Sequence, residues 1–273
     1  MLKNQLMVYK KIMKKLFTIL ILHLAFICNA QRTMFGSQNN YAAPAVASNL
    51  VALGLIQNLD ANNNNSYGGT GTTWYDLAGS NNGAISGAAF TTTGNVSYFN
   101  FTSKVAASYI TAPITKTTSM TFNVWAKVSA LNSYSCMLFN AGPDGRGPDM
   151  FFYNAKCFWN VWDSEASPFL NASSGYVNTA TMIPDINWHN YTIVVDANAI
   201  NTKLYFDGVL VGTAVYWSPI KNDNTTLYIG GAGANDYGWS WLGGIASFQS
   251  YNRALTAAEV TTNFNALKSR FGF

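Results

Sequence analysis

The sequence is poor in the side chains on which most catalytic and metal centres depend. Beyond residue 30 it contains one histidine, His189, and two glutamates, Glu165 and Glu259. A cluster of histidines around a transition metal is therefore excluded. A Ser-His-Asp arrangement would need His189, and no Gly-x-Ser-x-Gly motif accompanies it. We expect His189 to be a strand histidine packed beside Trp188.

Pairs of carboxylates are equally scarce. Glycoside hydrolysis ordinarily needs two carboxylates that flank the scissile bond. Glu165 and Glu259 lie 94 positions apart, and Glu259 is accounted for by a helix cap. Asp163 and Glu165 would share one face if a strand continued that far, but neighbouring acidic residues in loops are usually just solvated. The sequence therefore predicts no carboxylate-pair enzyme.

Positive charge is concentrated at the N-terminus. Five of the sixteen Lys and Arg residues precede residue 30, where no acidic residue occurs. The lysine-rich residues 10–15 are followed by the apolar run 16–28 and by the small Ala30. This pattern predicts a secretory signal peptide over residues 1–30. A lipid attached to Cys28 and a single uncleaved membrane anchor are the alternatives.

Removal of that segment also removes the excess of basic residues. Eleven basic and twelve acidic residues are left, so no basic surface argues for nucleic acid, and no transmembrane segment is expected in the mature chain. Residues 31–49 are small and polar and are predicted to be a flexible leader. Residues 50–273 suffice for one large domain. Few charges and many Asn, Thr, Gly and aromatic residues favour a β-sandwich that is secreted, exposed at the cell surface or periplasmic.

Only two cysteines lie beyond residue 30, Cys136 and Cys157, and both occur in strand-like runs. In an oxidising compartment they could pair. We favour a disulfide over two separate buried thiols, although the sequence does not fix the geometry that a disulfide needs.

Alternation of apolar and polar residues predicts β-strands along most of the chain. The clearest is 120–128, which predicts one core face and one face that carries polar groups and Trp125. Residues 50–59 and 188–196 are further strands, and 203–215 predicts a hairpin with an Asp-Gly turn. At least eleven strands predict two packed antiparallel sheets, a jelly roll.

The chain ends in a strand followed by a helix. Residues 241–251 are apolar and aromatic, which predicts a buried strand. Thr256 and Glu259 then have the spacing of a capping box. Apolar residues recur after it at three- and four-residue spacing: Val260, Phe264 and Leu267. A short amphipathic helix is therefore expected to close the fold.

Three parts of the chain resemble laminin-G-like domains of the concanavalin A-like lectin/glucanase superfamily. They are the C-terminal Gly244-Ile245 with 251–256 and Glu259, the Leu59-Asp60-Ala61 segment with 69–79, and the strand at Trp188-His189 with its following hairpin. The resemblance covers residues 50–272. It implies an all-β, two-sheet antiparallel jelly-roll sandwich with a short C-terminal helix.

The same resemblance bears on chemistry. Glucanases of this fold carry a Glu-x-Asp-x-Glu type of strand motif, which is absent here. Relatives commonly have an acidic pair after the Gly-Ile of the last strand, where this chain has Ala246 and Ser247. Both departures argue against catalysis, and the second weakens any calcium site on that strand.

Calcium is nevertheless the one ion for which suitable oxygens are present, and no cofactor is required. Candidate ligands are Asp60 with Asn62 and Asn63, Asp76, and Asp236 beside Asn235. For Asp60 and Asp76 the alternative is capping of nearby turn amides.

Aromatic side chains are the remaining candidates for ligand binding. The loop 233–239 combines rings, an acid and an amide in Asn235, Asp236, Tyr237 and Trp239, and further candidates are Trp125 and Trp217. Filling of the core between the sheets is the alternative for each ring. The sequence predicts a secreted, non-catalytic module that binds a polysaccharide or glycan, or a cell-surface protein. A structural or adhesive surface protein is the second hypothesis and a glycoside hydrolase the third.

Overall fold

The computed structural model describes residues 50–102, 108–131, 135–139, 148–153, 156–161, 177–182, 185–215, 225–231 and 240–273. Within these residues two eight-stranded sheets, here called sheet A and sheet B, are formed by antiparallel strand pairs. One α-helix, followed by a 3-10 helix, ends the chain. No described helix is long and apolar enough to cross a membrane. The predicted two-sheet sandwich with a C-terminal helix is confirmed.

Sheet A has the strand order β14-β13-β12-β7-β16-β5-β4, and β1 pairs with β16 beside β5. Its strands are β1 (Leu55–Asp60), β4 (Ala89–Thr93), β5 (Val96–Phe101), β7 (Met120–Val128), β12 (His189–Asp196), β13 (Asn201–Phe206), β14 (Val209–Val215) and β16 (Gly243–Tyr251). The first strand begins later than predicted. Gly54 turns the chain with a φ of +79°, and Leu55 N–H bonds Ala52 O across that turn.

Sheet B has the order β11-β10-β9-β8-β15-β6-β3-β2. Its strands are β2 (Thr73–Trp74), β3 (Gly83–Ser86), β6 (Tyr109–Pro113), β8 (Ser135–Phe139), β9 (Pro148–Tyr153), β10 (Lys156–Val161), β11 (Val177–Met182) and β15 (Thr226–Ile229). The apolar faces of the two sheets enclose one core that includes Trp74, Phe99, Phe122, Ile193 and Phe248.

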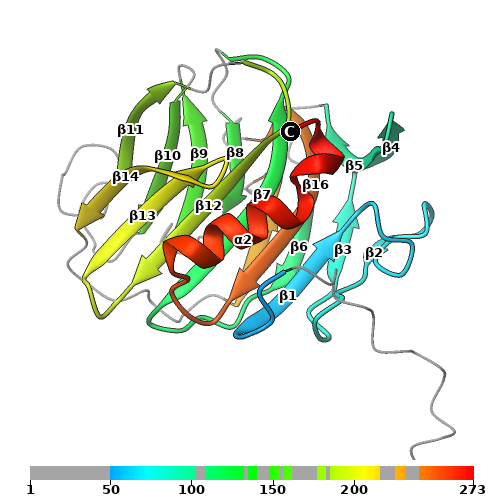
Figure 1. Cartoon of the computed structure of the whole chain (residues 1–273). Coiled ribbons are helices and arrows are strands. Elements are labelled where there is room, and N and C mark those ends of the chain that lie inside the picture. Colours follow the sequence, from blue (N-terminus) through cyan, green and yellow to red (C-terminus); the bar gives the residue numbers. More distant parts are fainter. Residues whose placement is uncertain are drawn as a thin grey trace, which may run out of the picture. The chain divides into compact units, whose positions relative to one another are not determined.

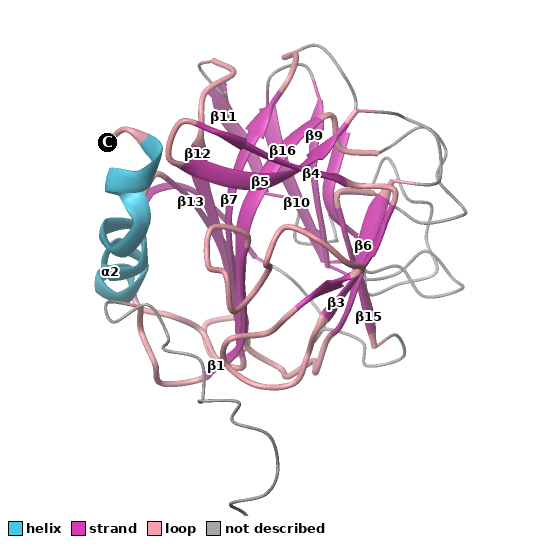
Figure 2. Ribbon diagram, turned by 90° about the vertical axis from the view of Figure 1, so that its right-hand side faces the viewer, coloured by secondary structure: helices cyan, strands magenta, loops and turns pink. Residues whose placement is uncertain are grey.

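Helix α2 (Ala257–Leu267) lies on the outer face of sheet A and continues into η2 (Lys268–Phe271). In Figure 1 the red helix crosses β12, β7 and β16, and Figure 2 shows it on the side of the sandwich away from sheet B. The predicted capping box is confirmed, because Glu259 N–H bonds the Thr256 hydroxyl and Thr256 N–H bonds the Glu259 carboxylate.

The helix changes the character of the sheet face below it. Residues 120–128 are predicted to have a core face and a polar face, but the polar face is also buried under α2. Asn123 has no exposed surface and bonds three neighbours: it donates to Gln249 Oε1 at 2.7 Å and accepts from Asn190 Nδ2 at 2.9 Å and Thr192 Oγ1 at 2.6 Å. The outer face therefore holds a buried hydrogen-bond network around Asn123, whereas the nearby Trp125 Nε1 and Ser247 Oγ have no hydrogen-bond partner among the described residues.

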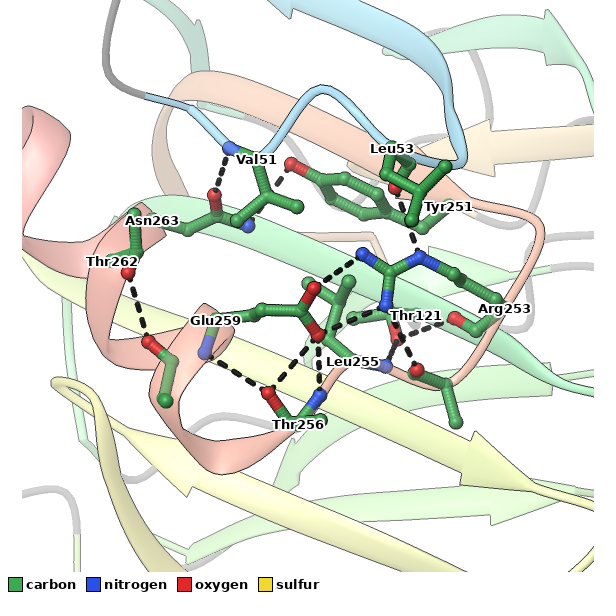
Figure 3. A network of polar contacts seen from close by, with 12 residues as sticks. Val51, Leu53, Thr121, Tyr251, Arg253, Leu255, Thr256, Glu259, Thr262 and Asn263 are labelled. Atoms are coloured by element: carbon green, nitrogen blue, oxygen red, sulfur yellow. Dashed lines mark hydrogen bonds and ion pairs between the residues drawn. The ribbon is translucent and has the colours of Figure 1, made fainter.

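Arg253 fixes the start of the helix to the first turn of the domain. Its guanidinium donates to both carboxylate oxygens of Glu259, at 2.9 and 2.6 Å, and its Nε donates to Leu53 O at 2.9 Å (Figure 3). Hydrogen bonds from Arg253 lower the pKa of Glu259 to about 2, despite the opposing effect of burial. Farther along the helix, Asn263 donates to the hydroxyl of Tyr251 and accepts from Val51 N–H.

The strands that carry the two cysteines are not neighbours. β9 lies between β8 and β10, with Cys136 opposite Phe151 and Cys157 opposite Phe152. Two strand spacings of about 4.8 Å separate their backbones by more than the Cα distance of a disulfide. The favoured disulfide between Cys136 and Cys157 is therefore incompatible with this register.

Candidate functional site

Most of the predicted binding residues lie outside the described part of the chain. These are Trp217 and the loop residues Asn235, Asp236, Tyr237 and Trp239. The nearest described residues on either side of that loop are Gly231 and Ser240. A Cβ placed on Gly231 would lie 3.3 Å from Tyr109 Cβ and 3.6 Å from Ser240 Oγ. Gly231 and Ser240, which flank the predicted loop in sequence, therefore lie beside the first residue of β6.

Trp125 is described, and it offers no surface to a ligand. Its side chain has no exposed surface. The indole is stacked on Phe271, with ring centres 4.0 Å apart and planes at 7°, and it also stacks on Phe264 of α2. A binding role for Trp125 would require an open ring face, but Phe264 of α2 and Phe271 of η2 cover the indole.

Two tyrosines instead lie on the outer face of sheet B next to Gly231. Along β6 and β15 buried residues alternate with half-buried ones, and the buried Ile110 and Ile229 belong to the core between the sheets. Tyr109 and Tyr228 therefore point away from the core. Their rings meet edge to face, with centres 5.5 Å apart.

Hydroxyl groups lie on the same face around this pair. Thr111 of β6 is directly opposite Tyr228 on one side and Ala84 of β3 on the other, and Ser86 is opposite Tyr109. Partly exposed aromatic rings flanked by hydroxyl groups are typical of sugar-binding sites. The ring face packs on the C–H groups of the sugar, and the hydroxyls exchange hydrogen bonds with it. We call Tyr109, Tyr228, Thr111 and Ser86 the sheet B face.

Sequence reasoning missed the sheet B face, although the alternation that reveals it is readable. In the segments YITAP and TLYI the apolar Ile110, Ala112, Leu227 and Ile229 form one period-two set, and the tyrosines fall in the other. The sequence-based prediction concentrates on tryptophan and on one loop, whereas these tyrosines come together only through the pairing of β15 with β6.

The two aspartates proposed as calcium ligands are occupied by hydrogen-bond donors. Asp60 accepts from Arg270 through both oxygens, at 2.7 and 3.0 Å, and from Asn62 N–H at 3.0 Å. Asp76 accepts from the N–H groups of Asn58, Ala78 and Asn81 at 2.8 to 3.0 Å. Both carboxylates thus have the turn-capping geometry that was the alternative to metal binding.

The rest of the described chain adds no group of metal ligands. Ala246 and Ser247, which replace the acidic pair of relatives, are buried in β16. No cluster of three His, Cys, Asp or Glu side chains able to hold a metal occurs among the described residues. Asp236, the third calcium candidate, lies outside them, as do Asp163 and Glu165.

His189 is held between two carboxylates. Its Nδ1 is 2.7 Å from Asp207 Oδ2 and its Nε2 is 3.0 Å from Asp185 Oδ1. The imidazole also packs on Phe206, with ring centres 4.5 Å apart, rather than beside Trp188 as expected. Burial lowers the pKa of His189, but the two carboxylates outweigh burial and raise it. Both ring nitrogens are engaged, so the imidazole has no nitrogen left for a substrate.

Comparison with known proteins agrees with this architecture. Residues 93–261 match the family model described as the concanavalin A-like lectin/glucanases superfamily. The chain belongs to this family. The match includes the strand at His189, its hairpin and the capping box, whereas the resembling segment at residues 59–79 lies before it. No curated protein matches the chain in sequence.

Solved structures share the fold at low sequence identity. The binding domain of botulinum neurotoxin DC in complex with SialylT has a TM-score of 0.60 and 15% identity, covering 79% of this chain and 52% of that one. Domain 4 of AbnA, a GH43 extracellular arabinanase from Geobacillus stearothermophilus, in complex with arabinotriose, has a TM-score of 0.53 and 17% identity, covering 76% and 96%. Trypanosoma rangeli sialidase has a TM-score of 0.56 and 16% identity, covering 81% and 34%.

The chain spans about half the length of the toxin binding domains that it matches. Binding domains are prominent among the similar structures, and glycosidases also occur. At these identities the likeness establishes the lectin-like sandwich fold.

Proposed function

We propose that the protein is an extracellular, non-catalytic module that binds carbohydrate through the sheet B face. The observation that carries the proposal is the pair Tyr109–Tyr228, which is partly exposed on the face opposite α2 and lies next to Gly231. Tyrosines held by neighbouring strands present rigid ring surface at little cost in side-chain entropy.

Carboxylates of the described residues are engaged in structural contacts, which supports binding rather than hydrolysis. In the described residues Asp60, Asp76 and Glu259 each bond a guanidinium or backbone amides, and Asp185 and Asp207 bond His189. Hydrolysis would need one ionised and one protonated carboxyl on either side of an open cleft. Of the similar structures, domain 4 of the arabinanase favours a sugar ligand most directly, because it is in complex with arabinotriose.

A glycan array tests the proposal. The purified protein is applied with the variants Tyr109→Ala and Tyr228→Ala, and affinities for each bound glycan are then measured by calorimetry. We expect each variant to lose about tenfold or more in affinity. A tenfold loss corresponds to about 1.4 kcal/mol of binding free energy, which is within the range for truncation of a tyrosine that is important to an interface. Tyr75→Ala is the matched control, because Tyr75 is 46% exposed and lies outside the sheet B face.

Three results would contradict the proposal. The first is the absence of binding to any glycan together with capture of a defined protein partner, which would favour the adhesive alternative. The second is release of reducing sugar from a polysaccharide, which would show catalysis. The third is glycan binding that Tyr75→Ala weakens as much as Tyr109→Ala does.

A further inference from the structure

Lys127, on the outer face of sheet A, has no acidic partner among the described residues. Lys127 Nζ donates to Tyr98 Oη at 3.1 Å, and it lies 4.4 Å from the ring centre of Tyr98 and 5.1 Å from that of Trp188. No carboxylate of the described residues forms an ion pair with this amine. Aromatic faces and a neutral phenol stabilise an ammonium group without neutralising its charge.

A glycine in the strand below Tyr98 and Trp188 leaves room for their rings. Lys127 of β7 is opposite Gly244 of β16, which is opposite Asn100 of β5. A Cβ on Gly244 would lie 2.7 Å from Tyr98 Cδ2 and 2.8 Å from Trp188 Cη2, so the two rings occupy the space above this glycine. The rings meet edge to face at 5.0 Å, and Trp188 also contacts Phe271 at 5.4 Å. Packing thus fixes both rings.

Polar groups complete the cluster. Thr93 Oγ1 is 3.2 Å from Tyr98 Oη, and Thr93 is exposed, whereas Lys127 and Trp188 are half-buried. Burial raises the pKa of Tyr98, but hydrogen bonds to Thr93 and Lys127 and the lysine charge outweigh it and lower this pKa. The local potential therefore favours negative charge beside an exposed hydroxyl and a partly exposed indole.

We propose that Lys127, Tyr98, Trp188 and Thr93 form a second binding site, which takes the anionic group of an acidic sugar. The amine pairs with a carboxylate or sulfate oxygen, the indole packs against the sugar ring, and Thr93 exchanges a hydrogen bond with a ring hydroxyl. The site lies on the opposite outer face of the sandwich from the sheet B face, so it does not depend on that face being a glycan site.

The test compares three oligosaccharides that differ in one substituent: a neutral galactose oligomer, a galacturonate oligomer of the same length and a sulfated galactose oligomer. The measured quantity is the gain in affinity of each acidic oligomer over the neutral one. We expect wild-type protein to show this gain and Lys127→Gln to lose about tenfold or more of it, as expected for a charge-assisted hydrogen bond. A gain of wild-type protein for one or both acidic oligomers identifies carboxylate, sulfate or both as the ligand group.

Two further variants make the result specific. Lys203→Gln is the matched control, because Lys203 lies on the same outer face, two residues before Tyr205 in β13, and has no ring partner among the described residues. It should keep the gain. Tyr98→Phe keeps the ring but removes the phenol, and it should lower the gain by about fivefold. If Lys127→Gln does not fold, the change in the acidic gain of Tyr98→Phe tests the proposal instead.

The proposal is overturned if wild-type protein binds neither acidic oligomer better than the neutral one. It is also overturned if Lys203→Gln and Lys127→Gln reduce the gain equally, since that would reflect net charge alone. Tyr109→Ala distinguishes the two proposals, because it lowers affinity for the neutral oligomer if the sheet B face binds sugar, and it leaves the acidic gain unchanged.

Discussion

Arg270 and Asp60 join the end of the chain to its first strand. The guanidinium of Arg270, in η2, donates to both carboxylate oxygens of Asp60 at 2.7 and 3.0 Å. Asp60 ends β1 and is only 4% exposed. A two-bond pair of this kind fixes orientation as well as distance. The C-terminal segment is thereby attached to sheet A at a second point, beyond the attachment through Arg253.

Arg270→Gln should destabilise the fold because it leaves the Asp60 carboxylate buried without its cation. We expect a loss of about 2 kcal/mol in the free energy of unfolding, less than for a fully buried pair because the arginine is partly exposed. The corresponding fall in Tm is about 4–8 °C. Calorimetry measures it, with Lys268→Gln in the same helix as the control; equal shifts in the two variants would contradict a specific pair.

Asp76 provides a test of turn capping against calcium binding. Its carboxylate accepts three backbone N–H groups, and the one from Asn58 is buried. Asp76→Ala should cost about 3 kcal/mol, since those amides lose their acceptor. The decrease in Tm should be the same in excess calcium and in EDTA.

Asp196→Ala is the comparison for that variant, because Asp196 caps two exposed amides. We expect it to cost less than about 1 kcal/mol. A decrease for Asp76→Ala that appears only with calcium present would assign the carboxylate to a metal instead.

The buried network under α2 shows where sequence reasoning reaches its limit. The alternation in β7 correctly predicts the strand, and the capping box correctly locates the helix. What the pattern cannot show is that the helix packs on the polar face, because Asn123, Gln249 and Asn190 are ordinary surface residues by type. They are buried only because they bond one another across three strands. That match between strands far apart in sequence depends on register.

The same limit applies to the prediction that Trp125 is a binding residue. An aromatic residue on a polar strand face is informative about binding only if the face is open. Here Phe264 and Phe271 of the C-terminal segment cover it. Conversely, Tyr109 and Tyr228 are ordinary in their own segments and become a pair only through strand pairing. Local pattern therefore identifies the elements, whereas contacts between distant elements decide which faces are available.

Asn123→Ala should be among the most damaging polar substitutions in the domain. It removes one donor and two acceptor contacts and leaves groups of Gln249, Asn190 and Thr192 buried without this partner. We expect a loss of about 3 kcal/mol or more, measured by urea unfolding. In a double-mutant cycle with Gln249→Ala, the coupling should exceed about 1 kcal/mol. Additive losses would show that the amides act independently.

His189 should make stability depend on pH above 6.5. Because the carboxylates of Asp207 and Asp185 raise its pKa above the ordinary 6.5, the folded state binds the proton more tightly than the unfolded state. This contribution to stability is complete below pH 6.5 and is lost as the pH rises through the raised pKa. A tenfold difference in proton affinity between the two states corresponds to about 1.4 kcal/mol of stability.

The free energy of unfolding is therefore measured as a function of pH for wild-type protein and for His189→Gln. The difference between them should shrink as the pH rises above 6.5. Asp207→Asn should weaken the dependence more than Asp185→Asn does, since the Asp207 side chain is 17% exposed and that of Asp185 is 42% exposed. Solvent screens the more exposed pair more strongly. Curves for wild-type and His189→Gln that stay parallel across this range would show that the pKa of His189 is the same in the folded and unfolded states.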